Sequence, residues 1–295
     1  MFLLYINDMP GHVHTGTRCR LFADDTLLYR VIDTIADQVQ FQQDLKNLEQ
    51  WAVTWGMVFN PSKCYIMSVG KGRTHKPHFY ELCGVVLNSV DQERYLGVIL
   101  SQDMTWNPHI SYITSKANQK LGFIKRNLKG SPQELKRLAY ISLVRSGMEY
   151  ASTVWDPHLS KDKDSMERVQ RRAARWITSS YDQTTSVTAL LQQLQLEPLE
   201  ERRRVNRIAF LYKILNEQVA VPPVKLDIIM NNRPVRGSVT QQRLHIPRCR
   251  TTEFQKSFTP RTIPEWNSLP NAITSAASVS SFRSQLTTSV MSLHP

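Results

Sequence analysis

Two adjacent carboxylates, Asp24 and Asp25, are the residues of this chain best suited to metal-dependent chemistry. They follow an aromatic and a small residue, Phe22 and Ala23, and lie between two apolar runs. Mg²⁺ prefers hard oxygen ligands, and a tight turn between paired strands would hold such ligands rigidly. Two such ions, about 4 Å apart, can clamp the attacking and leaving oxygens of an in-line displacement. The alternative is an ordinary polar turn, because aspartate is common in turns.

A β-hairpin over residues 17–31 is the element expected to position these carboxylates. Residues 18–22 and 26–31 are compatible with strands, and the three residues between them, Ala23 to Asp25, would form the turn. A helix is expected next, since apolar residues follow at spacings of three and four. These residues are Phe41, Leu45, Leu48, Ala52 and Trp55.

Short strands are predicted to complete this first region. They cover residues 64–69, 79–87 and 94–100, and a stretch rich in glycine and lysine at 70–77 follows the first of them. The fold class expected for residues 1–100 is therefore α+β, with a hairpin, a helix and short antiparallel strands.

The pattern becomes helical after residue 101. Asn107 is expected to cap a helix whose first residue is Pro108. Residues 131–134, Ser-Pro-Gln-Glu, are interpreted as a capping box that opens a second helix. The remaining helices are expected at about 161–176, 184–195 and 198–217, and residues 220–295 are expected to be rich in loops with one short final helix.

Composition and charge restrict the class of protein. The chain has 295 residues, of which 41% are hydrophobic and 21% charged, as in a folded globular protein. The early apolar run at 1–6 is too short to span a bilayer and lacks the features of a signal peptide, so we expect an intracellular protein of the nucleus or cytoplasm with no membrane partner. The four cysteines are scattered without a metal-ligand spacing.

The net charge of +12 is concentrated in residues 161–295, which carry +9. Four arginines there, at spacings i, i+3, i+4 and i+7, would share one helix face: Arg168, Arg171, Arg172 and Arg175. Such a face could follow a phosphate backbone. A second group, Arg202, Arg203, Arg204 and Arg207, is equally basic. A solvated face paired with Glu167, Glu200 and Glu201 is the alternative for both groups, and the sequence leaves the second group undecided.

An ordered series of motifs resembles the reverse transcriptases of non-LTR (LINE, jockey-like) retrotransposons. Phe22-Ala23-Asp24-Asp25-Thr26 resembles the aromatic-Ala-Asp-Asp box of that family. The other segments that resemble it are Phe2 to Pro10, Trp51 to Cys64, Tyr95 to Leu100, Trp106 to Ile110, Glu149 to Pro157, Glu167 to Arg175, and Trp266 to Pro270 with Phe282. Each segment is short, so the resemblance rests on the order in which the segments follow one another along the chain.

The resemblance implies an organisation in four parts. Residues 1–100 would be part of a polymerase palm, 101–160 thumb-like helices, 161–219 a basic helical region, and 220–295 a loop-rich C-terminal tail. RNA template, DNA primer and dNTP would be the partners of the full-length enzyme, and two Mg²⁺ ions its cofactors.

The resemblance also implies roles for particular residues. Asp24 and Asp25 would be catalytic metal ligands. Lys63 would face the leaving pyrophosphate as a general acid or a charge stabiliser, although a solvated lysine after an Asn-Pro turn is an equal alternative. Tyr95, Leu96 and Gly97 would belong to the primer grip, and the four arginines at 168–175 would bind nucleic acid.

One metal ligand of this family is not matched. The family's site needs a further aspartate from a strand that would precede Met1, and Asp8 is better suited to capping a turn. The sequence therefore predicts the C-terminal part of a reverse transcriptase, inactive alone. The alternatives are a non-catalytic nucleic-acid-binding protein derived from a retrotransposon and a remnant without function.

Overall fold

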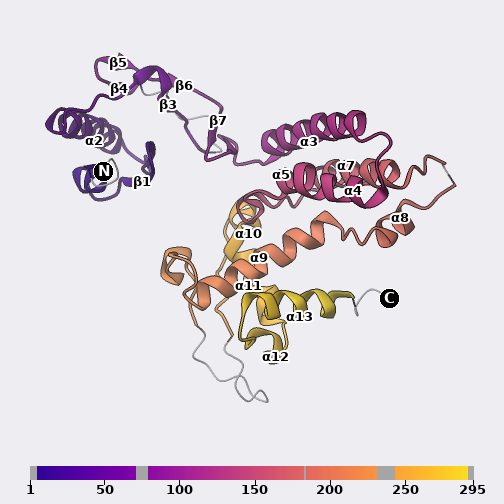
Figure 1. Cartoon of the computed structure of the whole chain (residues 1–295). Coiled ribbons are helices and arrows are strands. Elements are labelled where there is room, and N and C mark those ends of the chain that lie inside the picture. The colour runs from indigo at the N-terminus through magenta and orange to yellow at the C-terminus, as the bar shows by residue number, and fades with distance from the viewer. Residues whose placement is uncertain (1–4, 71–78, 183, 231–242, 292–295) are drawn as a thin grey trace. The chain divides into compact units, whose positions relative to one another are not determined.

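The computed structural model describes residues 5–70, 79–182, 184–230 and 243–291, and the chain forms two compact units, residues 1–105 and 106–295 (Figure 1). The first unit combines one long helix with short strands, and the second is helical. The predicted α+β class is therefore confirmed. The finer division into four parts remains a prediction. No helix within the described ranges is long and apolar enough to cross a membrane.

The acidic hairpin forms where the sequence predicts it. Strands β1 (Arg18–Phe22) and β2 (Asp25–Tyr29) pair in antiparallel register, with Phe22 opposite Asp25. Only Ala23 and Asp24 therefore form the turn, and Asp25 is the first residue of β2. Ala23 takes a left-handed backbone conformation with φ 51°, which costs a residue with a Cβ about 1 kcal/mol.

Helix α2 (Ile35–Thr54) begins with a capping box, in which Thr34 and Asp37 satisfy each other's backbone N–H groups. Its buried face includes the predicted Phe41, Leu45, Leu48 and Ala52. The expectation for Trp55 was wrong: it is the C-cap and 43% exposed, whereas Trp51 is buried. The helix ends before the 3.6-residue period reaches Trp55.

Four short strand pairs make up the sheets of the first unit. Besides the hairpin, β3 (Tyr65–Ile66) pairs in parallel with β6 (Asn88–Ser89), β4 (Glu81–Leu82) pairs with β5 (Val85–Val86), and β7 (Gln92–Tyr95) pairs with β8 (Val98–Ser101). The single strands predicted at 79–87 and 94–100 are thus hairpins. The turn pairs Cys83-Gly84 and Leu96-Gly97 all have positive φ, which reverses the chain. Most of the 70–77 stretch lies outside the described residues.

Helix α2 carries two small apolar cores. One gathers Ile6, Met9, Cys19, Leu48, Trp51 and Ala52, and the other Phe41, Leu45, Tyr80, Leu82 and Leu87. Leu28 of the acidic hairpin and Phe59 pack against both cores. Asp8 precedes the 3-10 turn η1 (Met9–His12) without capping it, and instead accepts the indole N–H of Trp51 at 2.8 Å. The acidic hairpin is thereby fixed to α2.

The second unit begins with seven helices and a π-helical segment. They are α3 (Asn107–Asn127), α4 (Gln133–Ala139), the π segment η3 (Tyr140–Arg145), α5 (Ser146–Glu149), α6 (Ser152–Trp155), α7 (Ser160–Thr178), α8 (Val187–Gln193) and α9 (Leu199–Leu215). Two capping predictions were wrong. Trp106, not Asn107, is the N-cap of α3, and Pro132 precedes α4 without any side-chain cap bond.

The tail is more helical than the sequence suggests. After the 3-10 turn η4 (Pro223–Leu226) come α10 (Thr252–Lys256), α11 (Phe258–Asn267), α12 (Asn271–Thr274) and α13 (Val279–Met291). Helices α11 and α13 pack on α9 and share its core, where Trp266 and Tyr212 both stack on Phe282. The expectation of a loop-rich tail overlooked the apolar spacing of Ile263, Trp266 and Leu269.

Candidate functional site

The acidic hairpin presents its carboxylates to solvent. Asp24 and Asp25 are both exposed, and within the described ranges neither carboxylate takes part in a hydrogen bond or an ion pair. Phe22, directly before them, is 63% exposed. Buried carboxylates are normally paired, and turn aspartates usually bond to nearby backbone N–H groups. Two adjacent carboxylates without such partners keep their oxygen lone pairs available for a cation.

These carboxylates fit part of a divalent-metal site. Their oxygens are the hard ligands that Mg²⁺ prefers, and the paired strands hold them on a short scaffold. No group of three or more candidate ligand side chains occurs in the part of the chain that the structure describes. When bound, the metal would neutralise charge that develops on phosphate oxygens. Asp24 and Asp25 would hold it, and further ligands must come from elsewhere.

Tyr95 is the last residue of β7 in the β7–β8 hairpin. Burial raises the pKa of the Tyr95 phenol, and the negative charges of Asp25 and Cys19 raise it further. The charge of Asp25 therefore acts on Tyr95, and the role of Tyr95 in a site stays a prediction.

The predicted primer-grip residues form the tip of that second hairpin. Tyr95 pairs with Val98, and the two residues between them have φ 47° at Leu96 and φ 83° at Gly97. A leucine in the left-handed region has a strained backbone. Such a backbone conformation persists only where the surrounding structure enforces it. The half-buried Leu96 side chain is consequently held at a fixed position on the tip.

Lys63 is exposed at the end of the 3-10 turn η2 (Pro61–Lys63), which Asn60 caps through the backbone N–H of Ser62. Phe59, four residues earlier, packs against the cores that hold the acidic hairpin. This contact brings the segment into the same unit as Asp24. No contact between Lys63 and either aspartate is recorded, so its role stays a prediction.

Helix α7 presents the predicted basic face. Arg168, Arg171 and Arg172 are exposed, and no carboxylate within the described residues lies at ion-pair distance from them. Arg172 donates to Asn118 of α3 at 3.0 Å. Arg175 differs from these three because it is half-buried and donates to the backbone oxygen of Asp182 at 2.8 Å.

The carboxylates proposed as partners for this face are engaged elsewhere. Glu167 accepts the backbone N–H of Glu200, and burial raises its pKa. Glu200 pairs with Lys163, and Glu201 pairs with Arg204. The three exposed arginines therefore carry positive charge that these acids do not neutralise.

Lys125 of α3 extends the basic face, although the sequence pattern did not predict its place there. Its pKa is lowered, first by burial and then by the positive charge of Arg172. Helix α3 packs along α7, which explains this proximity. The basic residues of α3 could have been noticed, but their placement beside α7 depends on tertiary packing.

The second arginine group, left undecided by the sequence, has a structural role. Arg203 and Arg207 of α9 are buried and pair with Asp156, which Arg261 of α11 also contacts at 3.1 Å. Arg202 pairs with Glu149 and Glu197, and Arg204 pairs with Glu201 and Glu265. Asp156 could not be identified from sequence patterns, because it lies 47 residues from its nearest arginine partner.

Comparison with known proteins identifies the class. Residues 1–100 match the family model described as reverse transcriptase (RNA-dependent DNA polymerase). The chain is therefore related to the reverse transcriptases of non-LTR retrotransposons, and the resemblance noted in its motifs is confirmed. No solved structure matches it.

Individual relatives come from Drosophila melanogaster and Drosophila funebris. The probable RNA-directed DNA polymerase from transposon BS of D. melanogaster is 26% identical over 189 residues, which cover 61% of this chain and 20% of that protein. The probable polymerase from transposon X-element of the same species is 24% identical over 60% of this chain and 20% of its own length. The polymerase from mobile element jockey of D. funebris is 24% identical over 62% and 22%. The chain thus spans about a fifth of these relatives, and the likeness reaches past residue 100 into the helical unit.

Proposed function

We propose that this chain is the C-terminal part of an RNA-directed DNA polymerase of a non-LTR retrotransposon. Its acidic hairpin would supply two of the carboxylates of a two-metal nucleotidyl-transfer site. The observation that carries the proposal is the pair of exposed carboxylates, without a hydrogen-bond or ion-pair partner among the described residues, in a segment that matches the reverse transcriptase family.

The role of each residue follows from its position. Asp24 and Asp25 would hold Mg²⁺ beside the phosphate under attack, and Lys63 would stabilise charge on the leaving pyrophosphate. The tip at Leu96 and Gly97 would position the primer end. RNA template, DNA primer and dNTP are the partners proposed for the full-length enzyme.

We further propose that the 295-residue chain alone does not polymerise. Two carboxylates without a third bind metal weakly, and catalysis depends on charge already organised at the reacting phosphate. Primer extension with Mg²⁺ should give no product above background. Extension that Asp24→Asn abolishes would contradict this part of the proposal.

A chimeric enzyme tests the polymerase assignment itself. Residues 1–100 would replace the aligned segment of an active jockey-type polymerase, and primer extension would be measured. We expect activity that falls by several orders of magnitude with Asp24→Asn, because a principal metal ligand is lost. The matched control is Asp33→Asn, an exposed aspartate outside the hairpin. Equal activity of the two variants would refute the assignment.

The basic face of α7 supports a second candidate function, non-catalytic binding of nucleic acid. Replacing Arg168, Arg171 and Arg172 with glutamine should weaken oligonucleotide binding and make it less sensitive to salt. The control replaces Lys225, an exposed basic residue of η4, outside α7. Filter binding over a salt series measures both, and unchanged binding by the triple variant would exclude this surface.

A further inference from the structure

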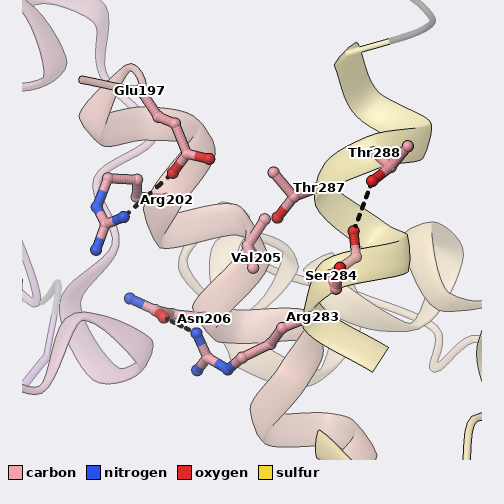
Figure 2. A pocket seen from close by; sticks show the side chains of 8 residues that line it. All are labelled: Glu197, Arg202, Val205, Asn206, Arg283, Ser284, Thr287 and Thr288. Atoms are coloured by element: carbon pink, nitrogen blue, oxygen red, sulfur yellow. Dashed lines mark hydrogen bonds and ion pairs between the residues drawn. The ribbon is translucent and has the colours of Figure 1, made fainter. Parts of the chain in front are cut away.

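A polar pocket of about 370 Å³ lies between helices α9 and α13. Figure 2 shows two guanidinium groups at its wall, from Arg202 of α9 and Arg283 of α13. Asn206, Ser284, Thr287 and Thr288 supply an amide and three hydroxyl groups. The carboxylate of Glu197 also lines the pocket, where it pairs with Arg202. The remaining donors suit an anion with several oxygens.

The two arginines differ in how their charge is balanced. Arg202 pairs with Glu149 and Glu197, and its pKa is raised mainly by its hydrogen bond to Glu149. Arg283 donates only to the amide oxygen of Asn206, at 2.9 Å (Figure 2), and the described residues place no carboxylate at ion-pair distance from it. The charge of Glu149 acts on Arg283, but Glu149 already pairs with Arg202, so Arg283 is a half-buried cation without an ion-pair partner of its own among the described residues.

The surroundings of Arg283 make that charge unfavourable. Its pKa is lowered by burial first and by the positive charge of Arg202 second. The hydroxyl of Thr287, one helical turn along α13, makes no hydrogen bond within the part described, whereas Thr288 donates to the Ser284 backbone oxygen at 3.0 Å. The guanidinium of Arg283 and the hydroxyl of Thr287 thus occupy the same face of α13 at the pocket.

We propose that this pocket binds a phosphate group, with Arg283 and Thr287 as donors and Arg202 as a second cation. The phosphate could belong to a nucleic-acid strand or to a free nucleotide. The proposal that the phosphate belongs to a nucleic-acid strand rests on the proposed function. The proposal that the pocket binds a phosphate group does not. The anion would balance the charge of Arg283 and complete its hydrogen bonds.

Chemical footprinting of the unmodified 295-residue chain gives the first test. Phenylglyoxal modification of each arginine would be measured by mass spectrometry at low salt, with a single-stranded oligonucleotide, with a dNTP or with inorganic phosphate. We expect Arg283 to be protected severalfold, while the exposed Arg250 stays reactive. Protection by the oligonucleotide alone identifies a strand as the source, and protection by dNTP or phosphate identifies a free ligand. Absence of protection in all three arms overturns the proposal.

Variants give the second test. Arg283→Gln should weaken oligonucleotide affinity about tenfold and lower the salt slope by about 1, as expected for one lost phosphate contact. Arg283→Lys should recover part of the affinity, and Arg250→Gln, which removes the same charge elsewhere, should have little effect. Full affinity with Arg283→Gln, while the α7 triple variant loses binding, refutes the pocket and leaves the proposed function standing. Failure of every form to bind any nucleic acid counts against both.

Discussion

At the scale of single residues, one buried aspartate organises much of the second unit. Asp156 accepts from Arg203 at 2.9 Å, from Arg207 and from Arg261 at 3.1 Å, and it joins the end of α6 to α9 and α11. Arg203 is fully buried, and two of its guanidinium nitrogens have no hydrogen-bond partner within the part of the chain that the structure describes. Because buried charges are costly unless paired, the fold depends on this one carboxylate.

Asp156→Asn should destabilise the protein by about 3–5 kcal/mol, the usual cost of breaking a buried ion pair from one side. The substitution keeps the shape of the side chain but leaves Arg203 without a counter-charge and Arg207 with Glu265 as its remaining ion-pair partner. Urea denaturation followed by circular dichroism measures the change. Asp164→Asn, on the exposed surface of α7, is the control and should change stability little. Equal stability of the two variants would show that the ion pairs of Asp156 do not stabilise the fold.

Glu167 allows a prediction about pH. Burial raises its folded-state pKa above the ordinary glutamate value, so the folded state favours the neutral form. The group therefore destabilises the fold at neutral pH, and this cost disappears as pH falls below the unfolded-state pKa of about 4.3. Glu167→Gln should raise the Tm at pH 7 and leave it unchanged near pH 3, measured by thermal unfolding. A lower Tm of the Glu167→Gln variant at pH 7 would show that the hydrogen bond from the Glu200 backbone N–H to Glu167 stabilises the fold by more than the burial of the charge destabilises it.

At the scale of elements, α2 holds the acidic hairpin in place. Its buried face contributes to both cores of the first unit, and the hairpin packs on those cores through Leu21 and Leu28. Its buried Asp44 also accepts from the His14 backbone at 2.9 Å and from the Thr17 side chain at 2.5 Å, which fixes the chain just before β1. The geometry of Asp24 and Asp25 thus depends on the stability of α2.

Thr34→Ala should lower the stability of the first unit by about 1 kcal/mol, because the capping box at the start of α2 is lost. Thr54→Ala is the matched control, since Thr54 lies in the last turn of the same helix and only donates to the Gln50 backbone oxygen. Guanidinium titration of both variants compares them. Equal losses of unfolding free energy in the two variants would mean that the capping box does not stabilise α2.

The elements also show how far the sequence could lead. The hairpin and the long helices follow from alternation and from apolar spacing, which are local signals. The turn at Leu96-Gly97 was missed although glycine marks it, because leucine at positive φ is rare. The role of Arg203 and Arg207 could not be inferred, since their partners Asp156 and Glu265 lie 47 to 58 residues away in the sequence. The position of the basic face on α7 could be predicted from helical spacing. The contribution of Lys125 could not, because it depends on the packing of α3 against α7.

At the scale of the whole molecule, the second unit contains what it needs to fold. One of its cores runs from Val205 to Leu286 and draws on α9, α11, α12 and α13. The ion pairs of Asp156, Glu149 and Glu265 are also made within residues 106–295. A unit with its own core and internally paired charges should not require residues 1–105 for stability.

We therefore expect residues 106–295, expressed alone, to unfold cooperatively and to keep the near-ultraviolet circular dichroism of the buried Trp155, Trp176 and Trp266. A shorter chain, residues 106–218, is the control: it removes α11 and α13, exposes the apolar face of α9 and leaves Arg207 without Glu265. That control should show helical far-ultraviolet signal with a weak, broad transition. The same outcome for residues 106–295 would show that the second unit depends on the first, whereas a sharp transition would allow the α7 face and the α9–α13 pocket to be studied apart from the acidic hairpin.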